Sequence, residues 1–199
     1  MERTTRAFPI VISGPSGVGK TTLVDRLLET DRSLRESIST TTRPPRDGEE
    51  EGAHYFFVSR EDFETMKDAD LVEWAEVHGE LYGTPREFIE RELRAGHDVV
   101  LNIDIQGGNS VKRAFPDAVM VFILPPSFSA LEARIRRRGD DEDIDIQKRL
   151  ITARNEINAS DSYDYIIVND ELHRAVGELQ AIVTAERCRQ SRMPETLKP

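Results

Sequence analysis

A glycine-rich segment between an apolar run and an amphipathic stretch constrains this chain more than any other feature. Gly14-Pro-Ser-Gly-Val-Gly-Lys-Thr21 has the spacing G-x-x-x-x-G-K-[ST]. The apolar run Phe8–Ser13 before it predicts a buried strand, and leucines at helical spacing over Lys20–Glu29 predict a helix that begins at once. A strand, such a loop and a helix in direct succession are typical of a site that binds the phosphates of a nucleotide.

The chemistry of this phosphate loop follows from its residue types. Glycines let backbone N–H groups turn inward around phosphate oxygens, and the positive end of the helix dipole reinforces them. Lys20 can reach the β- and γ-phosphates, and the hydroxyl of Thr21 is placed to ligate Mg²⁺. The alternative is a turn that merely joins a strand to a helix, and the complete pattern in this context argues against it. The loop alone does not name a reaction, because GTPases, motor ATPases and small-molecule kinases all use it.

The rest of the chain alternates strands with helices. Further apolar runs predict strands at Val99–Ile105, Val119–Leu124 and Tyr163–Val168. Helical patterns cover Glu87–Arg94, Ala130–Arg138, Ile146–Ile157 and Leu172–Arg187. This alternation predicts an α/β fold with a parallel sheet covered by helices on both faces.

Residues from about 37 to 93 break this rhythm. His54–Val58 and Leu71–Val77 look like strands of an antiparallel or mixed piece, with a short helix over Arg60–Asp68 between them. We interpret this piece as an insertion, because the parallel pattern resumes after it. Gly139–Asp145 is a second interruption and is acidic and turn-like.

Composition excludes several classes of partner. The formal net charge of −10 opposes the broad phosphate-backbone contacts of nucleic-acid binders. Val119–Leu124 is among the longest apolar runs and is far shorter than the roughly 20 residues of a membrane helix. Cys188 is the only cysteine and Met1–Ala7 lacks an apolar signal core, so we expect a cytoplasmic protein without disulfides. We therefore expect small-molecule substrates, no nucleic acid and no membrane, and a monomer or homodimer.

Basic residues gather on a proline-stiffened segment, Ser39-Thr-Thr-Thr-Arg-Pro-Pro-Arg46. Two guanidinium groups on a rigid backbone suit a phosphate dianion, because each can donate a bidentate pair of hydrogen bonds. Tyr55 and Tyr82 could add hydroxyl donors. The alternative is a solvated basic loop beside the acidic run Glu49–Glu51.

In this segment and in several further motifs, the chain resembles the guanylate kinases. The resemblance covers roughly residues 8–190 and follows the family's order and spacing. The matching motifs are T-T-R-P-P-R-x-G-E and G-x-H-Y-F-F-V within Ser39–Val58, Glu73-Trp-Ala-Glu76, Gly79-Glu-Leu-Tyr-Gly-Thr84, Ile103-Asp-Ile-Gln-Gly107, Ile123-Leu-Pro-Pro126, Arg138-Gly139, Lys148-Arg149-Leu150 and Ile167-Val-Asn-Asp170.

The resemblance implies a P-loop nucleoside monophosphate kinase: one domain of 199 residues with a parallel-sheet core, an inserted mixed α/β GMP-binding subdomain and a small lid. The core would comprise about 8–36, 94–137 and 157–190, the insertion about 37–93 and the lid about 138–156. The implied activity is transfer of the γ-phosphoryl group of ATP to GMP, and also to dGMP, with Mg²⁺ as cofactor, in purine nucleotide metabolism. The implied ATP-binding residues are Gly14, Pro15, Ser16, Gly17, Val18, Gly19, Lys20, Thr21, Thr22 and Asn169.

The acceptor residues follow in the same way. Arg43, Arg46, Tyr55 and Tyr82 would hold the GMP phosphate. Glu73 and Asp104 would read the guanine, helped by the hydroxyls of Ser39 and Thr84. Guanine offers N1–H and the N2 amine as adjacent donors to a carboxylate, whereas adenine would leave that carboxylate unpaired. For Glu73 the alternative is an ordinary surface carboxylate on a strand.

The implied catalytic residues are Lys20, Arg43, Arg134, Arg138 and Arg149. The last three would be lid arginines that close over the transferring phosphoryl group and neutralise its charge. The alternative for the Arg134–Arg138 run is a solvated basic helix end. One position departs from the family: Asn102 stands where an acidic residue is usual, which puts the metal environment in question.

Two other functions compete with this one. A guanylate-kinase-like protein-binding module would not need a working phosphate loop, yet Gly14, Gly19, Lys20 and Thr21 are all present. A kinase of similar fold for a sugar-phosphate acceptor would not need the base-reading residues Ser39, Glu73, Thr84 and Asp104, and all four are present.

Overall fold

The computed structural model describes residues 5–77, 79–137 and 143–193. Its larger sheet has five strands in the order β2-β7-β1-β8-β9. Their bounds are Pro9–Ser13 (β1), Leu34–Glu36 (β2), Asp98–Asn102 (β7), Val119–Leu124 (β8) and Tyr165–Val168 (β9). All neighbouring strands pair in parallel, which confirms the predicted α/β fold.

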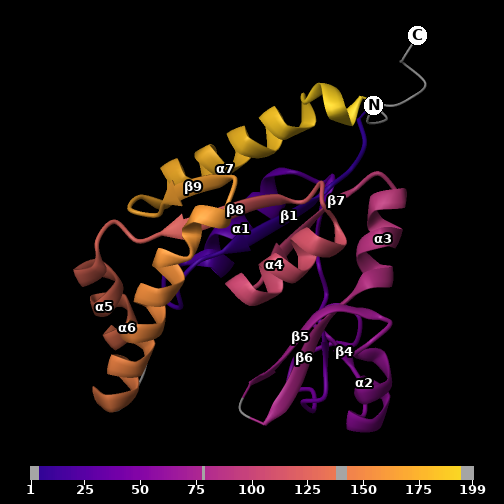
Figure 1. The fold of residues 1–199 in the computed structure, drawn as a ribbon, viewed down its shortest axis with the longest axis horizontal. Helices are drawn as coiled ribbons and strands as arrows, with labels where there is room; N and C mark the ends of the chain where they lie inside the picture. Colours follow the sequence, from indigo (N-terminus) through magenta and orange to yellow (C-terminus); the bar gives the residue numbers. More distant parts are fainter. Residues whose placement is uncertain (1–4, 78, 138–142, 194–199) are drawn as a thin grey trace.

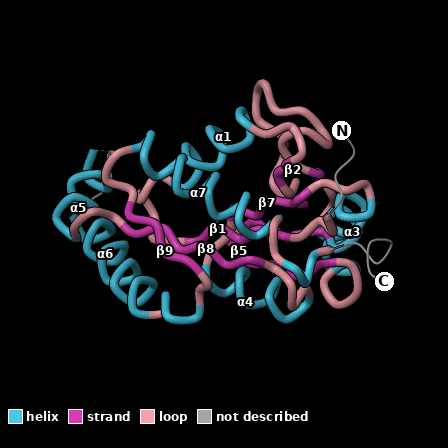
Figure 2. Tube along the Cα trace, turned by 90° about the horizontal axis from the view of Figure 1, so that it is seen from above, coloured by secondary structure: helices cyan, strands magenta, loops and turns pink. Residues whose placement is uncertain are grey.

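Helices cover both faces of this sheet. α1 (Lys20–Thr30) and α7 (Leu172–Arg187) lie on one face, and α3 (Arg86–Arg94) and α4 (Ile105–Ala114) lie on the other (Figure 2). Side chains alternate along the central strand, so Ile10 and Ile12 join one apolar cluster and Val11 joins the opposite one. Because both faces are covered, every residue of β1 is buried.

Two further helices, α5 (Phe128–Arg137) and α6 (Asp143–Asn158), lie at the end of the molecule beyond β9 (Figure 1). Short 3₁₀ turns occupy Ser160–Ser162 and Gln190–Arg192. Within the described ranges, no helix is both long and apolar enough to span a membrane.

The second sheet is mixed, as the sequence predicts. Its four strands run in the order β4-β3-β6-β5. Their bounds are Thr40–Thr41 (β3), Phe56–Phe57 (β4), Leu71–Val77 (β5) and Glu80–Pro85 (β6), with α2 over Arg60–Met66. Phe63, Leu71 and Leu81 form a small core beneath it. Position 83 of β6 favours glycine, because a Cβ there would lie 2.6 Å from a Leu71 methyl carbon of this core.

Some predicted bounds were wrong. The strand predicted for Val99–Ile105 ends at Asn102, and Asp104 then caps α4, which the sequence reading missed. The Asp104 carboxylate accepts a hydrogen bond of 2.8 Å from the Gly107 N–H, the usual chemistry of a helix N-cap. The strand predicted for His54–Val58 shrinks to two residues. Of the predicted acidic turn Gly139–Asp145, the last three residues belong to α6 and the others lie outside the described residues.

Arg187 at the end of α7 fastens the helix to the sheet. Its guanidinium lies 2.9 Å from the fully buried carboxylate of Asp98 and 2.5 Å from that of Asp31. It also donates to the Ser33 hydroxyl at 2.8 Å. Asp98 in turn accepts a 3.0 Å hydrogen bond from the Phe8 N–H. This network therefore ties α7 to the beginnings of three neighbouring segments of the core.

Candidate functional site

The candidate site lies along the carboxyl ends of the parallel strands. β1 ends at Ser13 and leads into the phosphate loop, β7 ends at Asn102 beside it, and β9 ends at Val168 just before Asn169. Since the carboxyl ends of parallel strands meet at one edge of a sheet, residues far apart in the sequence converge there.

The phosphate loop has the backbone that its glycines predict. Gly14, Gly17 and Gly19 have φ values of 151°, 85° and 102°, which side chains rarely tolerate. A Cβ on Gly14 would lie 2.4 Å from the carbonyl oxygen of Ile123. The loop encloses a hollow of about 290 Å³. Its lining comprises Gly14, Ser16, Gly17, Gly19, Lys20, Thr21, Asn102, Ile103, Asp104 and Glu156.

Lys20 folds back onto this loop. Its Nζ donates to the carbonyl oxygen of Gly14 at 2.5 Å and to that of Pro15 at 3.4 Å. Thr21 follows in the first turn of α1, is exposed, and accepts a 3.4 Å hydrogen bond from the Asn102 amide. Thr22 is exposed in the same turn. The structure thus places a cation and a hydroxyl at the hollow, as the sequence predicts.

The outer side of the loop is held by the end of β9 and by α5. The amide of Asn169 donates to the Val18 carbonyl at 2.8 Å. Arg134 donates to the same carbonyl at 3.1 Å and to the Asn169 carbonyl at 3.0 Å. Asn169 and Val18 are both buried. In this structure the Arg134 guanidinium therefore binds backbone carbonyls. Its expected position over the transferring phosphoryl group stays a prediction.

Of the other two lid arginines, Arg149 reaches the loop. It donates from α6 to the hydroxyl of Ser16 at 3.0 Å. Arg138 lies outside the described residues.

Arg43 is paired with an anion of the chain itself. Its Nη2 lies 2.7 and 3.0 Å from the two carboxylate oxygens of Glu49, which also accepts a 2.8 Å bond from the Arg46 N–H. The guanidinium of Arg43 lies 5.4 Å from the Tyr55 ring centroid, and Tyr82 packs edge-on against Tyr55 at 6.0 Å. The Glu49 hydrogen bonds raise the pKa of Arg43, and the Arg43 bonds lower the pKa of Glu49. Arg43, Tyr55 and Tyr82 thus converge, whereas Arg46 is exposed.

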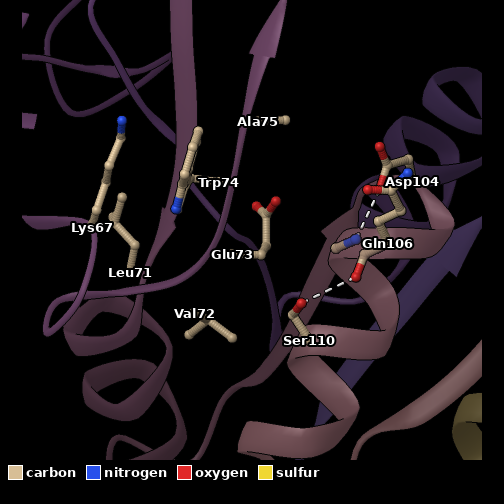
Figure 3. Close-up of a pocket in the computed structure, with 10 residues that line it drawn as sticks. Lys67, Leu71, Val72, Glu73, Trp74, Ala75, Asp104, Gln106 and Ser110 are labelled. Carbon is tan, nitrogen blue, oxygen red and sulfur yellow. Dashed lines mark hydrogen bonds between the residues drawn. The ribbon is translucent and has the colours of Figure 1, made fainter. Parts of the chain in front are cut away.

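Glu73 and Thr84 are in direct contact, as two members of the predicted base-reading set. They face each other across β5 and β6, and the buried Thr84 hydroxyl donates to the Glu73 carboxylate. Figure 3 shows that carboxylate beside Asp104 and Gln106 of the α4 segment. Burial raises the pKa of Glu73, with a smaller contribution from the Asp104 charge, and the Thr84 hydrogen bond only partly opposes this. Glu73 and Asp104 line one hollow of about 270 Å³.

A larger hollow of about 520 Å³ is lined by residues of the second sheet's surroundings and by residues near the loop. Ser39, Tyr55 and Thr84 line it on one side, and Thr21 and Asn102 line it on the other. Thr21 and Asn102 also line the hollow of the phosphate loop, and Asp104 lines both that hollow and the hollow of Glu73. The predicted donor and acceptor residues therefore line neighbouring hollows.

Two acidic residues at the site were not predicted. The sequence placed Glu49 only in an acidic run beside the basic segment, although its spacing of three from Arg46 could have suggested a turn contact. Glu156 of α6 lines the phosphate-loop hollow, and burial raises its pKa, partly offset by the positive charge of Lys20. Its helical surroundings in the sequence give no signal of this position.

Comparison with known proteins agrees with this geometry. The family model described as guanylate kinase matches residues 6–186. The chain belongs to the guanylate kinase family. It is 50% identical to the guanylate kinase of Desulfitobacterium hafniense, with 93% of each chain covered. It is 49% identical to that of Caldanaerobacter subterraneus, covering 92% of this chain and 89% of the relative. The crystal structure of guanylate kinase from Anaplasma phagocytophilum superposes with a TM-score of 0.73 at 31% identity, over 96% of this chain and 91% of that one.

Proposed function

We propose that this protein transfers the γ-phosphoryl group of ATP to GMP, giving ADP and GDP. The observation that carries the proposal is that Asp104 lines both the phosphate-loop hollow and the hollow of Glu73, a half-buried carboxylate that can accept two adjacent donors. Membership of the guanylate kinase family supports the same reaction.

On the donor side, the N–H groups of the loop bind the phosphates of ATP and Lys20 exchanges the Gly14 carbonyl for phosphate oxygens. The exposed Thr21 hydroxyl would hold Mg²⁺ together with ATP oxygens and water, with the Asn102 amide beside it. Such a sparse set of protein donors suits Mg²⁺, which usually keeps several waters. When bound, Mg²⁺ supplies positive charge that offsets the charge on the phosphate oxygens.

On the acceptor side, the Glu73 carboxylate accepts N1–H and the N2 amine of guanine. Thr84 holds one of its oxygens, and Asp104 and Ser39 complete the recognition of the base. Arg43, Arg46, Tyr55 and Tyr82 bind the phosphate, which requires Arg43 to loosen its pair with Glu49. An acceptor base without these two donors would leave the half-buried Glu73 carboxylate with only the Thr84 hydrogen bond, so it binds far more weakly.

Transfer itself needs positioning and charge neutralisation rather than a covalent intermediate. We assign Lys20, Arg43, Arg138 and Arg149 to the moving phosphoryl group, with Arg134 behind them at the loop. The insertion of about 37–93 and the lid of about 138–156 close over the two nucleotides and exclude water.

The test is a coupled assay of ADP release with ATP, Mg²⁺ and, in turn, GMP, AMP, UMP and ribose 5-phosphate. We expect fast turnover with GMP alone, and a loss of about a thousandfold in Lys20→Met because a cation that neutralises the transferring group is removed. Lys112→Met, which changes a lysine in the last turn of α4 that lines none of the three hollows, is the control. Turnover with another acceptor would overturn the base assignment, and no turnover with any acceptor would favour a binding module.

Finer assignments are part of the same proposal. We propose that dGMP is also an acceptor, that the reaction serves purine nucleotide metabolism, and that the protein is cytoplasmic, which its single cysteine supports. A monomer or homodimer is expected, and the molar mass measured by light scattering after size-exclusion chromatography distinguishes the two. The dGMP assignment fails if dGMP neither turns over nor competes with GMP.

A further inference from the structure

The carbonyl of Val18 is held away from the phosphate-loop hollow by two donors from outside the loop. Asn169 donates to it at 2.8 Å from the end of β9, and Arg134 donates at 3.1 Å from α5. Arg134 also bonds the Asn169 carbonyl, at 3.0 Å, so the three residues form a closed set. The Val18 side chain is fully buried in the larger core, which restrains the same peptide from the other end.

Because the peptide between Val18 and Gly19 is planar, fixing the Val18 carbonyl also fixes the direction of the Gly19 N–H. In a planar trans peptide, the C=O of one residue and the N–H of the next point in opposite directions. The described residues contain no cis peptide bond, so fixing the Val18 carbonyl toward Asn169 directs the Gly19 N–H away from Asn169. Gly19 lines the hollow of the phosphate loop. The anchor therefore aims this N–H at the space in which donor phosphates bind.

The contact between Gly19 and Asn169 is close enough to require glycine. A Cβ on Gly19 would lie 2.6 Å from the Asn169 amide nitrogen, and the φ of Gly19 is 102°. Any side chain at position 19 would push the amide off the Val18 carbonyl. The hydrogen bond from Asn169 to Val18 therefore depends on the absence of a side chain at Gly19.

We propose that Asn169 and Arg134 are positioning residues of the phosphate loop: they hold the Val18 carbonyl outward and thereby preset the Gly19 N–H for the phosphates of the donor. This inference rests on the proposed function, since it takes the loop to be the donor site. It differs from the expected contact of Asn169 with adenine, because a positioning residue acts on every ligand that has phosphates, whether or not it has a base.

Inorganic tripolyphosphate separates these roles, because it carries the phosphates of ATP and no base. We would measure the Kd of ATP, tripolyphosphate and GMP by isothermal titration calorimetry with Mg²⁺, for the full chain and its variants. Asn169→Ala removes one of the two donors, so we expect affinity for ATP and for tripolyphosphate to fall by the same factor, about tenfold. The GMP Kd and the preference for ATP over GTP should not change.

Arg134→Lys is the second variant. It keeps the positive charge but lacks the planar guanidinium that donates to both carbonyls at once. We expect a parallel loss of about threefold for both polyphosphates. Gln180→Ala is the matched control: it removes a 2.8 Å hydrogen bond to Thr30 on the helix face remote from the loop and should leave all three Kd values unchanged. Thermal unfolding establishes that each variant is folded at the assay temperature, and if Asn169→Ala is not, Arg134→Lys decides.

A fall in ATP affinity with unchanged tripolyphosphate affinity would overturn the inference and assign Asn169 to the base. Unchanged affinity for both would overturn it as well. Failure of the wild type to bind either polyphosphate would overturn both this inference and the proposed function, whereas wild-type turnover of GMP with unaffected variants would overturn the inference alone.

Discussion

The two sheets of this protein are made of different kinds of strand. In the parallel sheet, every residue of β1 and all but the last of β8 are buried, and these two strands are nearly continuous apolar runs. In the mixed sheet, β5 has one buried residue out of seven, and polar pairs such as Glu73 with Thr84 and Arg43 with Glu49 link its segments. Apolar burial is therefore concentrated in the first sheet, whereas Glu73 and Thr84, to which we assign acceptor selection, lie in the second.

The largest expected effect tests the selective side of this comparison. Glu73→Gln replaces a carboxylate, which can accept both the N1–H and the N2 amine of guanine, by an amide. The N–H₂ of that amide would face one of these donors. We expect kcat/KM for GMP to fall by about a thousandfold, with no loss of thermal stability. Glu76→Gln, at an exposed position of the same strand, is the control and should stay within twofold. Steady-state kinetics with varied GMP measures both, and a small effect at Glu73 would place base recognition elsewhere.

The next effect tests the stabilising side. Arg187→Met leaves the Asp98 carboxylate fully buried without its cation, so we expect the free energy of unfolding to fall by about 3 kcal/mol. The kcat of the folded fraction should not change. Arg174→Met on the same helix is the control, because its pairs with Asp170 and Glu178 are exposed and contribute little. Urea unfolding measures the difference; equal effects at both positions would contradict the assignment.

A smaller effect is expected from Thr84→Val, which keeps the shape of the buried side chain and removes its hydroxyl. The Glu73 carboxylate loses a hydrogen bond that lowers its pKa, so kcat/KM for GMP should fall about tenfold. Since guanine binds the charged carboxylate, the acid limb of the pH profile should move to higher pH. Thr65→Val on α2 is the matched control. An unchanged acid limb would mean that Glu73 does not govern it.

The smallest effect concerns stability and pH. Burial raises the pKa of Glu73 in the folded state, so the folded protein holds this proton more tightly than the unfolded chain. This contribution stabilises the wild type at pH values below the ordinary pKa of about 4.3 and is lost as the pH rises through the raised value. The melting temperature of Glu73→Gln relative to wild type should therefore be higher at pH 7.5 than at pH 4. A constant difference would indicate a carboxyl with an ordinary pKa.

The sequence predicted best where one physical rule governs a segment. β8 has the predicted bounds because an apolar run ends at two prolines, and β5 and α7 also match their predicted bounds. α4 was missed because Gly107 and Gly108 weaken its helical pattern. The structure requires these glycines, since a Cβ on Gly108 would lie 3.1 Å from a Val11 methyl carbon. A long-range packing contact thus overrides the local propensity, and the sequence does not display it.

The same limit applies to the site. The glycines, Lys20 and Thr21 could be placed from their motif, because loop, strand and helix fix them locally. The anchor formed by Arg134 and Asn169 could not, since it joins segments whose approach depends on the tertiary fold. The pair of Arg43 with Glu49 is local, and only the turn geometry of its loop was missing from the prediction.

Gly107 leaves space for the carboxylate of Glu73, to which we assign recognition of the acceptor base. A methyl group there would lie 3.1 Å from one carboxylate oxygen of Glu73, so that oxygen would have to move by a few tenths of an ångström while Thr84 holds the other. Acceptor range in such an enzyme can therefore evolve, or be engineered, at a position that contributes no functional group, through the space it leaves for its neighbour.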